Sequence, residues 1–216
     1  MSKILIAIPC MDQVPAPFAQ SLAMIRKGEH ECGVAFQMGS LIYTSRNNLA
    51  LTAIQGEYDW ILWLDSDMVF QQDVLQRMMQ VAEEHDLDFL SGLYFRRVPP
   101  FTPVMFKTLE KAEHGATWTE FEELPKELFE VAGCGFGLCL TKVDMIFDIQ
   151  AKHETLFTPF FGLGEDLAFC WRARQMGYKI YCDPTIEAGH VGYSVIGRSF
   201  YESYRNAHPK EATEEI

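Results

Sequence analysis

The sequence predicts an α/β fold in which helices flank a Rossmann-like, mostly parallel central sheet, with a small mixed β region attached. Three observations predict it. Over residues 1–97, short apolar runs alternate with segments whose apolar residues recur at helical spacing, which is the pattern of βαβ units. Apolar residues make up 48% of the 216 residues, which suits one globular domain. After residue 97, prolines, glycines and acidic residues interrupt the alternation, which indicates a mixed layer.

The first half of the chain predicts strands and helices in alternation. Each expected strand is a short apolar run, and each expected helix carries an apolar stripe on one face. The strands are expected at residues 3–8, 32–36, 60–64 and 89–94, and the helices at 39–55 and 72–84. The strand at 60–64 is the most hydrophobic, so we expect it to be buried within the sheet.

The second half is less regular. We expect strands at 103–107 and 117–121 around a charged turn, followed by a solvated acidic segment at 120–130. A strand interrupted by glycines is expected at 131–140 and a last strand at 179–182. Helices are expected at 142–151 and 164–176. Residues 206–216 form a polar tail, which we expect to fray. The sequence therefore predicts a single domain over residues 1–205.

Charge and composition argue against several classes of partner. Thirty acidic residues against eighteen basic ones give a net charge of −12, which opposes binding to nucleic acid or anionic membranes. No apolar run approaches the roughly 20 residues of an integral membrane segment, and Pro9 ends the first run too early for a signal peptide. The six cysteines form no CxxC pair, so we expect reduced thiols in a cytoplasmic protein. The oligomeric state is left open.

Two carboxylates follow the most hydrophobic strand. Residues 60–64 run directly into Asp65-Ser66-Asp67, and ligands of open α/β sheets bind beyond the carboxyl ends of the strands. Such a triplet also occurs in ordinary turns after strands. Two like charges beside an apolar strand end are costly unless a cation offsets them. We therefore favour an oxygen-rich site for a hard divalent cation.

A second acidic pair opens a later helix, directly after Gly162-Leu163-Gly164. The helix dipole favours acids in a first turn, which is the simpler explanation for Glu165 and Asp166. Asp166 also shares a stripe with Phe169 and Ala173, so we expect it to face inward. An inward carboxylate behind a flexible loop suits a general base.

A histidine and an arginine complete the set of candidate residues. His190 has a glycine before it and another two residues after it, and imidazole can join carboxylates around Mn²⁺ or Mg²⁺, although a single histidine is more often structural. Arg46 lies one turn before the buried face of its helix, with Asn47 next to it. It either covers the sheet edge or clamps a diphosphate.

The glycine-rich segment 133–137 resembles a phosphate-binding loop only superficially. It lacks the lysine and hydroxyl of GxxxxGK[ST] and opens no helix. We interpret it as a strand edge that lets a substrate approach. The aromatic residues are expected in the core, apart from one or two that stack on a sugar ring.

Together, Asp65-Ser66-Asp67 after a βαβ half, Gly164-Glu165-Asp166 at a helix start and Gly189-His190 near the C-terminus resemble the motifs of a GT-A fold glycosyltransferase. The group that matches is family 2-like, with small bacterial and phage members. The resemblance covers about residues 3–192. It implies the nucleotide-diphospho-sugar transferase fold, with a nucleotide-binding half at 1–97 and an acceptor-side half at 98–205.

The resemblance also implies a role for each matching residue. The donor would be a UDP- or GDP-sugar and the acceptor a glycan or another hydroxyl compound, with Mn²⁺ or Mg²⁺ as cofactor. Asp166, with Glu165, matches the catalytic base of inverting members, and Asp65, Asp67 and His190 match the metal site. The implied donor-binding residues are Ile8, Pro9, Cys10, Arg46, Asn47, Asp65, Ser66 and Asp67. The implied acceptor-side residues are Tyr94, Arg96, Gly135, Phe136 and Gly162.

Two departures and two rival functions remain. Many relatives place an aspartate at the end of the second strand to read uracil, whereas this chain has Phe36-Gln37-Met38 there. The QxxRW signature of processive synthases is absent, which favours single sugar addition. The motifs fit inverting and retaining outcomes alike.

A nucleotidyltransferase or metal-dependent phosphohydrolase would also use such acids. It would need a lysine near the glycine-rich segment, and the nearest is Lys142. A non-catalytic sugar-binding relative is the other rival.

Overall fold

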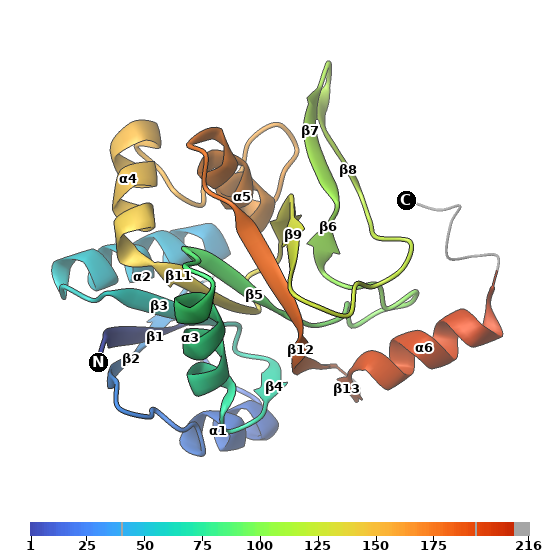
Figure 1. The fold of residues 1–216 in the computed structure, drawn as a ribbon, viewed down its shortest axis with the longest axis horizontal. Helices are drawn as coiled ribbons and strands as arrows, with labels where there is room; N and C mark the ends of the chain where they lie inside the picture. The colour runs from blue at the N-terminus through green and yellow to red at the C-terminus, as the bar shows by residue number, and fades with distance from the viewer. Residues whose placement is uncertain (40, 193, 210–216) are drawn as a thin grey trace.

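The structure is a computed structural model that describes residues 1–39, 41–192 and 194–209. A central sheet runs through the molecule with helices on both faces (Figure 1). Seven strands lie side by side in the order β13 (Val195–Ile196), β12 (Ile180–Val191), β5 (Phe89–Leu93), β11 (Leu138–Lys142), β3 (Trp60–Leu64), β1 (Lys3–Cys10) and β2 (Glu31–Met38). Two short strands, β4 (Met68–Phe70) and β9 (Phe129–Val131), also pair with β12.

The sheet is mostly parallel, as the sequence predicts. β1 pairs in parallel with both β2 and β3, and β12 pairs in parallel with β5. β11 runs antiparallel between β3 and β5. Because β1, β2 and β3 point the same way, their carboxyl ends meet at one edge of the sheet. Asp65 follows β3 at that edge.

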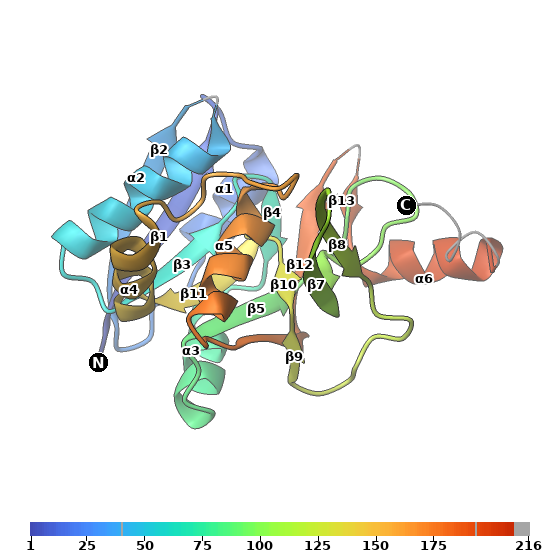
Figure 2. The same ribbon diagram turned by 90° about the horizontal axis from the view of Figure 1, so that it is seen from above.

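Alternate residues of each central strand face opposite cores, as the pleat requires. Leu5 and Ala7 of β1 pack with α2 (Ile42–Gln55), α4 (Val143–His153) and α5 (Glu165–Gln175). Ile4, Ile6 and Ile8 pack in a second core with α3 (Val74–Glu84) and with Phe18 of α1 (Ala16–Ala23). Figures 1 and 2 show these two groups of helices on the two sides of the sheet.

A mixed β region stands beside α5 and confirms the irregular second half. It contains the hairpin of β7 (Thr108–Ala112) and β8 (Gly115–Thr119) and the short pair of β6 (Met105–Phe106) and β10 (Gly133–Cys134). The last helix, α6 (Arg198–Ala207), extends away from the sheet next to this region (Figure 2). Within the described ranges, no helix is both long enough and apolar enough to cross a membrane.

Several boundaries differ from the expected ones. The expected strands at 103–107 and 117–121 are displaced, since the turn lies between β7 and β8. The last strand runs on to Val191, because β4 and β13 pair with its second half beyond an irregularity between Asp183 and Glu187. The expected strand at 131–140 is interrupted at Gly135-Phe136-Gly137, where it turns against Tyr94. α1, β4 and α6 were not anticipated.

Two differences concern helix ends. α1 follows a proline-rich stretch that resembles a loop, but a proline is accepted in the first helical turn, where its missing N–H is not needed. The helix expected from 39 begins at Ile42, and residue 40 lies outside the described residues. Of the predicted tail, Asn206 and Ala207 close α6, while 210–216 lie outside the described residues.

Candidate functional site

The candidate site is built around the turn that leaves β3. All five side chains of β3 are buried, and the next residue, Asp65, is the first whose side chain is partly exposed. The Asp65 N–H donates to the Gly137 carbonyl at 3.1 Å, and the Met68 N–H donates to the Asp65 carbonyl at 3.2 Å. These bonds close a turn over Asp65-Ser66-Asp67 and lead directly into β4. β4 pairs with β12 so that Met68 lies opposite His190.

That pairing brings Asp67 and His190 together from distant parts of the chain. The His190 Nε2 atom lies 3.3 Å from Asp67 Oδ2. On the other side of the ring, Nδ1 lies 3.0 Å from the Phe95 carbonyl oxygen. A carbonyl oxygen can only accept a hydrogen bond, so Nδ1 carries the hydrogen. In the neutral ring, Nε2 therefore presents a lone pair to a carboxylate oxygen, an arrangement that calls for a proton or a cation between them.

The donor set fits a divalent cation. A ring nitrogen and a carboxylate oxygen suit Mn²⁺, and a histidine that ligates a metal usually donates its other N–H to a carbonyl or carboxylate. Burial raises the pKa of Asp67, but a protonated His190, through its hydrogen bond and its charge, and the charge of Arg97 outweigh burial and lower the pKa. Asp67 is thereby held as the carboxylate that a cation requires.

Arg97 is a residue that sequence reasoning missed. Its Nη1 donates to Asp67 Oδ2 at 2.8 Å, and its side chain is 52% exposed. It uses the same carboxylate oxygen as His190. The arginine pair at 96–97 was visible in the sequence, but only the pairing of β4 with β12 indicates which of the two reaches Asp67.

Asp65 does not join Asp67 in a preformed cluster. Its Oδ1 accepts a hydrogen bond from Arg46 Nη2 at 2.9 Å. Among the residues that the structure describes, no group of three or more His, Cys, Asp and Glu side chains is arranged to hold a metal. The set predicted as Asp65, Asp67 and His190 is thus represented by an Asp67–His190 pair with Asp65 turned toward Arg46.

Arg46 is placed differently from the predicted diphosphate clamp. It is 2% exposed and lies beneath three carboxylates, at 2.9 Å from Asp65, 3.6 Å from Asp166 and 3.8 Å from Glu165. Its guanidinium also lies 5.4 Å from the centre of the Phe136 ring. Its Nε and Nη1 atoms have no hydrogen-bond partner, but they are buried and do not reach the surface at which a diphosphate would lie. Its charge instead holds together acids from the end of β3 and the start of α5.

Asp166 faces inward, as its stripe predicts. Its side chain keeps 28% of its surface, yet Oδ1 is buried and has no hydrogen-bond partner. Burial raises the pKa of Asp166 well above its usual range, and the neighbouring charges of Glu165 and Asp65 raise it further, whereas Arg46 opposes the rise. The result is a carboxylate of raised basicity with one buried oxygen and a partly exposed side chain.

Three residues expected on the acceptor side lie in the core. Tyr94 is 4% exposed and Phe136 is fully buried. Gly135 is buried against Tyr94, and a Cβ there would lie 2.0 Å from the Tyr94 hydroxyl. Gly137 donates its N–H to that same hydroxyl at 3.0 Å. These residues therefore form the packed base under the turn and have no side-chain surface with which to contact an acceptor.

The other expected residues lie around the turn or support it. Ile8 and Pro9 are buried and Cys10 is half-buried, at the end of β1 beside β3. Asn47 accepts a hydrogen bond from the Phe157 N–H at 3.0 Å, so its oxygen holds the loop before α5 and is not free for a donor. Gly162 is exposed with φ of 76° in that same loop.

Comparisons with known proteins agree with this arrangement. Residues 43–146, a little under half of the chain, match the model of the family described as glycosyl transferase family 2. The match contains Arg46 and Asp65-Ser66-Asp67 and ends before Asp166 and His190. No curated protein matches the chain. Among solved structures, A197 from STIV matches with a TM-score of 0.61 and 20% identity, over 89% of this chain and 86% of that chain.

The fold is therefore of the GT-A class, since the sheet, its flanking helices and the structural match agree. Over the matched region the chain is like glycosyl transferase family 2, and this supports a nucleotide-sugar glycosyltransferase in general.

Proposed function

We propose that the chain transfers a sugar from a nucleotide-diphosphate sugar, such as a UDP- or GDP-sugar, to a hydroxyl of a glycan or similar acceptor, with inversion and with a divalent metal. The observation that carries the proposal is the approach of Asp67 and His190, from segments more than a hundred residues apart, with the histidine N–H fixed on the Phe95 carbonyl.

On the donor side, Asp67 and His190 would hold Mn²⁺ or Mg²⁺, with Asp65 close by. The bound cation would offset the charge that develops on the departing diphosphate. Arg97 shares Asp67 Oδ2 and is half-exposed, so it has the freedom to turn toward a phosphate. At the neighbouring strand end, the half-buried Cys10 would lie against the nucleotide, with Ile8 and Pro9 buried beneath it.

On the acceptor side, Asp166 would act as the general base. As the acceptor oxygen attacks the anomeric carbon, Asp166 takes its proton, the bond from that carbon to the diphosphate breaks, and the electron pair leaves with the diphosphate. The raised pKa of Asp166, caused first by burial, strengthens it as a base. Arg46 opposes the rise by supplying a nearby positive charge, and Glu165 adds negative charge beside it.

The alternative function of a nucleotidyltransferase or phosphohydrolase depends on Lys142. A nucleotidyltransferase or phosphohydrolase would need a phosphate-binding lysine, and the nearest to the glycine-rich segment is Lys142. Lys142 lies opposite Trp60, at the start of β3 and away from Asp65. Its Nζ is paired with Asp88 at 2.9 Å. It is therefore not available to a ligand at the carboxyl end of β3.

The test compares two substitutions with one matched control. Asp67→Ala is expected to lose Mn²⁺-dependent binding of the nucleotide sugar, measured by calorimetry. Asp166→Asn is expected to keep donor binding and lose transfer by a factor of about 100 or more, in the range of general base catalysis. Asp144→Asn, at the exposed start of α4, should match the wild-type protein. Transfer by Asp166→Asn at the wild-type rate would remove Asp166 as the base.

A further inference from the structure

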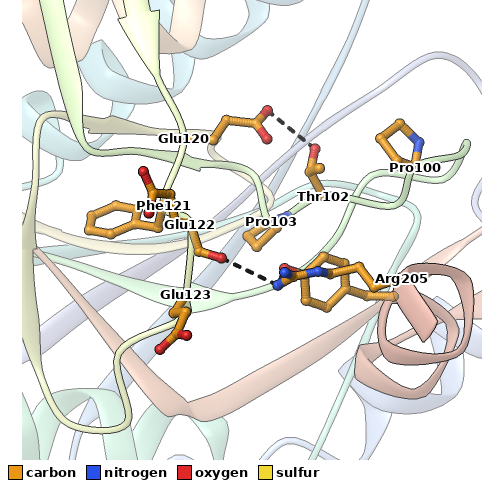
Figure 3. Close-up of a pocket in the computed structure, with 9 residues that line it drawn as sticks. Pro100, Thr102, Pro103, Glu120, Phe121, Glu122, Glu123 and Arg205 are labelled. Atoms are coloured by element: carbon orange, nitrogen blue, oxygen red, sulfur yellow. Dashed lines mark hydrogen bonds between the residues drawn. The ribbon is translucent and has the colours of Figure 1, made fainter. Parts of the chain in front are cut away.

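A cavity outside the candidate site lies between α6 and two irregular segments, 100–103 and 120–123 (Figure 3). Its volume is about 470 Å³, a size that accommodates a small organic ligand. Its walls come from three parts of the chain. The lining residues are Pro100, Thr102, Pro103, Glu120, Phe121, Glu122, Glu123, Tyr201 and Arg205.

One wall of the cavity is formed by Tyr201 and Arg205 of α6. Tyr201 is 7% exposed, and its ring stacks on Phe95 with 5.2 Å between ring centres. Arg205 Nη1 donates to the Tyr201 hydroxyl at 3.0 Å and to the Glu122 carbonyl at 3.3 Å. Figure 3 shows Arg205 extending from α6 toward Glu122, with Pro103 nearby. The Arg205 guanidinium also lies 5.6 Å from the centre of the Tyr201 ring, so the ring is nearly covered and the exposed Arg205 side chain is the surface that a ligand can contact.

The opposite wall supplies hydrogen-bond acceptors. Glu120 Oε1 accepts from Thr102 Oγ1 and Arg96 Nη2, both at 3.3 Å. Its other oxygen has no partner among the described residues, and the exposed side chains of Glu122 and Glu123 form no ion pair there. Carboxylates accept hydrogen bonds from hydroxyl groups and repel phosphates and carboxylates. With three carboxylates against the one guanidinium of Arg205, the lining is net negative, and the cavity therefore favours a neutral ligand rich in hydroxyls over an anionic one.

The cavity and the candidate site share one short segment, Phe95-Arg96-Arg97. Phe95 packs on Tyr201 in the cavity wall, while its carbonyl fixes His190. Arg96 reaches Glu120 in the cavity, and Arg97 reaches Asp67 in the site. A ligand long enough to pass this segment would contact both places.

We propose that this cavity binds saccharide units of the acceptor, beyond the unit whose hydroxyl reacts. The inference rests on the proposed function. It adds that the acceptor is a neutral oligosaccharide, whereas a phosphorylated or uronic acceptor would be repelled by Glu120, Glu122 and Glu123.

The experiment measures binding and transfer separately on the whole chain. Neutral disaccharides to pentasaccharides, with uronic and phosphorylated analogues, are titrated by saturation-transfer NMR and calorimetry. Glu120→Gln keeps the shape and removes the charge. Glu113→Gln, at the exposed end of the β7–β8 hairpin, is the matched control. We expect a neutral oligosaccharide to bind, Glu120→Gln to weaken it about tenfold, in line with a hydrogen bond to a charged group, and Glu113→Gln to match wild type.

The transfer assay decides whether the bound saccharide is the acceptor. With a labelled nucleotide sugar, added units should lower KM in the wild-type protein and less so in Glu120→Gln. Preference for anionic saccharides, binding unaffected by Glu120→Gln, or absence of saccharide binding would each overturn the cavity assignment. Saccharide binding without any effect on KM would overturn the acceptor assignment. Failure of the wild-type chain to bind any nucleotide sugar is a separate readout, which would overturn the proposed function itself.

Discussion

Replacing Arg46 by methionine tests the idea that one buried cation organises the acids of the site. The guanidinium is 2% exposed and serves Asp65, Glu165 and Asp166 at 2.9, 3.8 and 3.6 Å. Methionine fills a similar volume next to Phe136 and Phe157, so packing changes little. The substitution mainly removes the positive charge and leaves three carboxylates facing one another.

The expected loss of stability follows from that geometry. Removing one partner of a buried ion pair costs about 3–5 kcal/mol. Here the three carboxylates keep 20–29% of their side-chain surface, and water offsets part of the penalty. We therefore expect the free energy of unfolding to fall by about 3 kcal/mol at neutral pH.

The loss should depend on pH in a definite direction. Burial raises the pKa of Asp166 above its unfolded value, so the native state binds more protons than the unfolded state between the two values. Stability therefore falls as the pH rises from the ordinary carboxyl range, about 3.9, through the raised pKa. Without Arg46 the pKa rises further and this window widens. The deficit of Arg46→Met should then shrink as the pH is lowered and Asp166 takes up a proton.

Urea unfolding at pH 7.5 and pH 5.5 measures both effects. Arg174→Met serves as control, because Arg174 lies exposed on α5, the helix of Glu165 and Asp166, and donates one hydrogen bond to the Leu109 carbonyl. It should lose about 1 kcal/mol, equally at both pH values. The electrostatic account of this cluster would be refuted if the Arg46→Met variant were as stable as the wild-type protein, or if it lost the same free energy of unfolding at both pH values.

Two further predictions concern the turn and its base. Arg97→Gln should raise the affinity of the protein for Mn²⁺ in the absence of nucleotide by up to about fivefold, because the ion pair that it removes is partly exposed and worth about 1 kcal/mol or less. A titration that measures free Mn²⁺ by spin resonance checks this, and a lower affinity than that of the wild-type protein would contradict it. Gly135→Ala should destabilise the fold by about 1–3 kcal/mol, because its Cβ would lie 2.0 Å from the Tyr94 hydroxyl. Adding Tyr94→Phe should restore part of that loss in thermal unfolding, and additive losses would argue against this contact.

The fold could be predicted from the sequence where the pattern is local. β3 has the expected bounds, and each strand and helix expected up to residue 93 is found, although α1 and β4 were not anticipated. Prediction failed where partners are distant. The length of β12 depends on β4 and β13, which pair with its second half. The interruption before β11 depends on Tyr94, more than forty residues earlier.

The candidate site shows the same division. Asp67, Asp166 and His190 were selected for their residue types and positions, and Asp67 and His190 are in fact neighbours. The role of Arg46 could not be predicted, because the spacing on α2 indicates a buried face without showing that α5 places two acids above it. Arg97 was missed because a residue just after β5 reaches Asp67 only through the folded chain.

The most direct test of the central claim is a calorimetric titration of the full chain with a panel of UDP- and GDP-sugars, with and without Mn²⁺. We predict that at least one nucleotide sugar binds with Mn²⁺ present, that binding weakens strongly without the metal, and that Asp67→Ala loses the metal-dependent part. Absence of binding to every nucleotide sugar in the presence of Mn²⁺, or equal binding without it, would contradict the proposal.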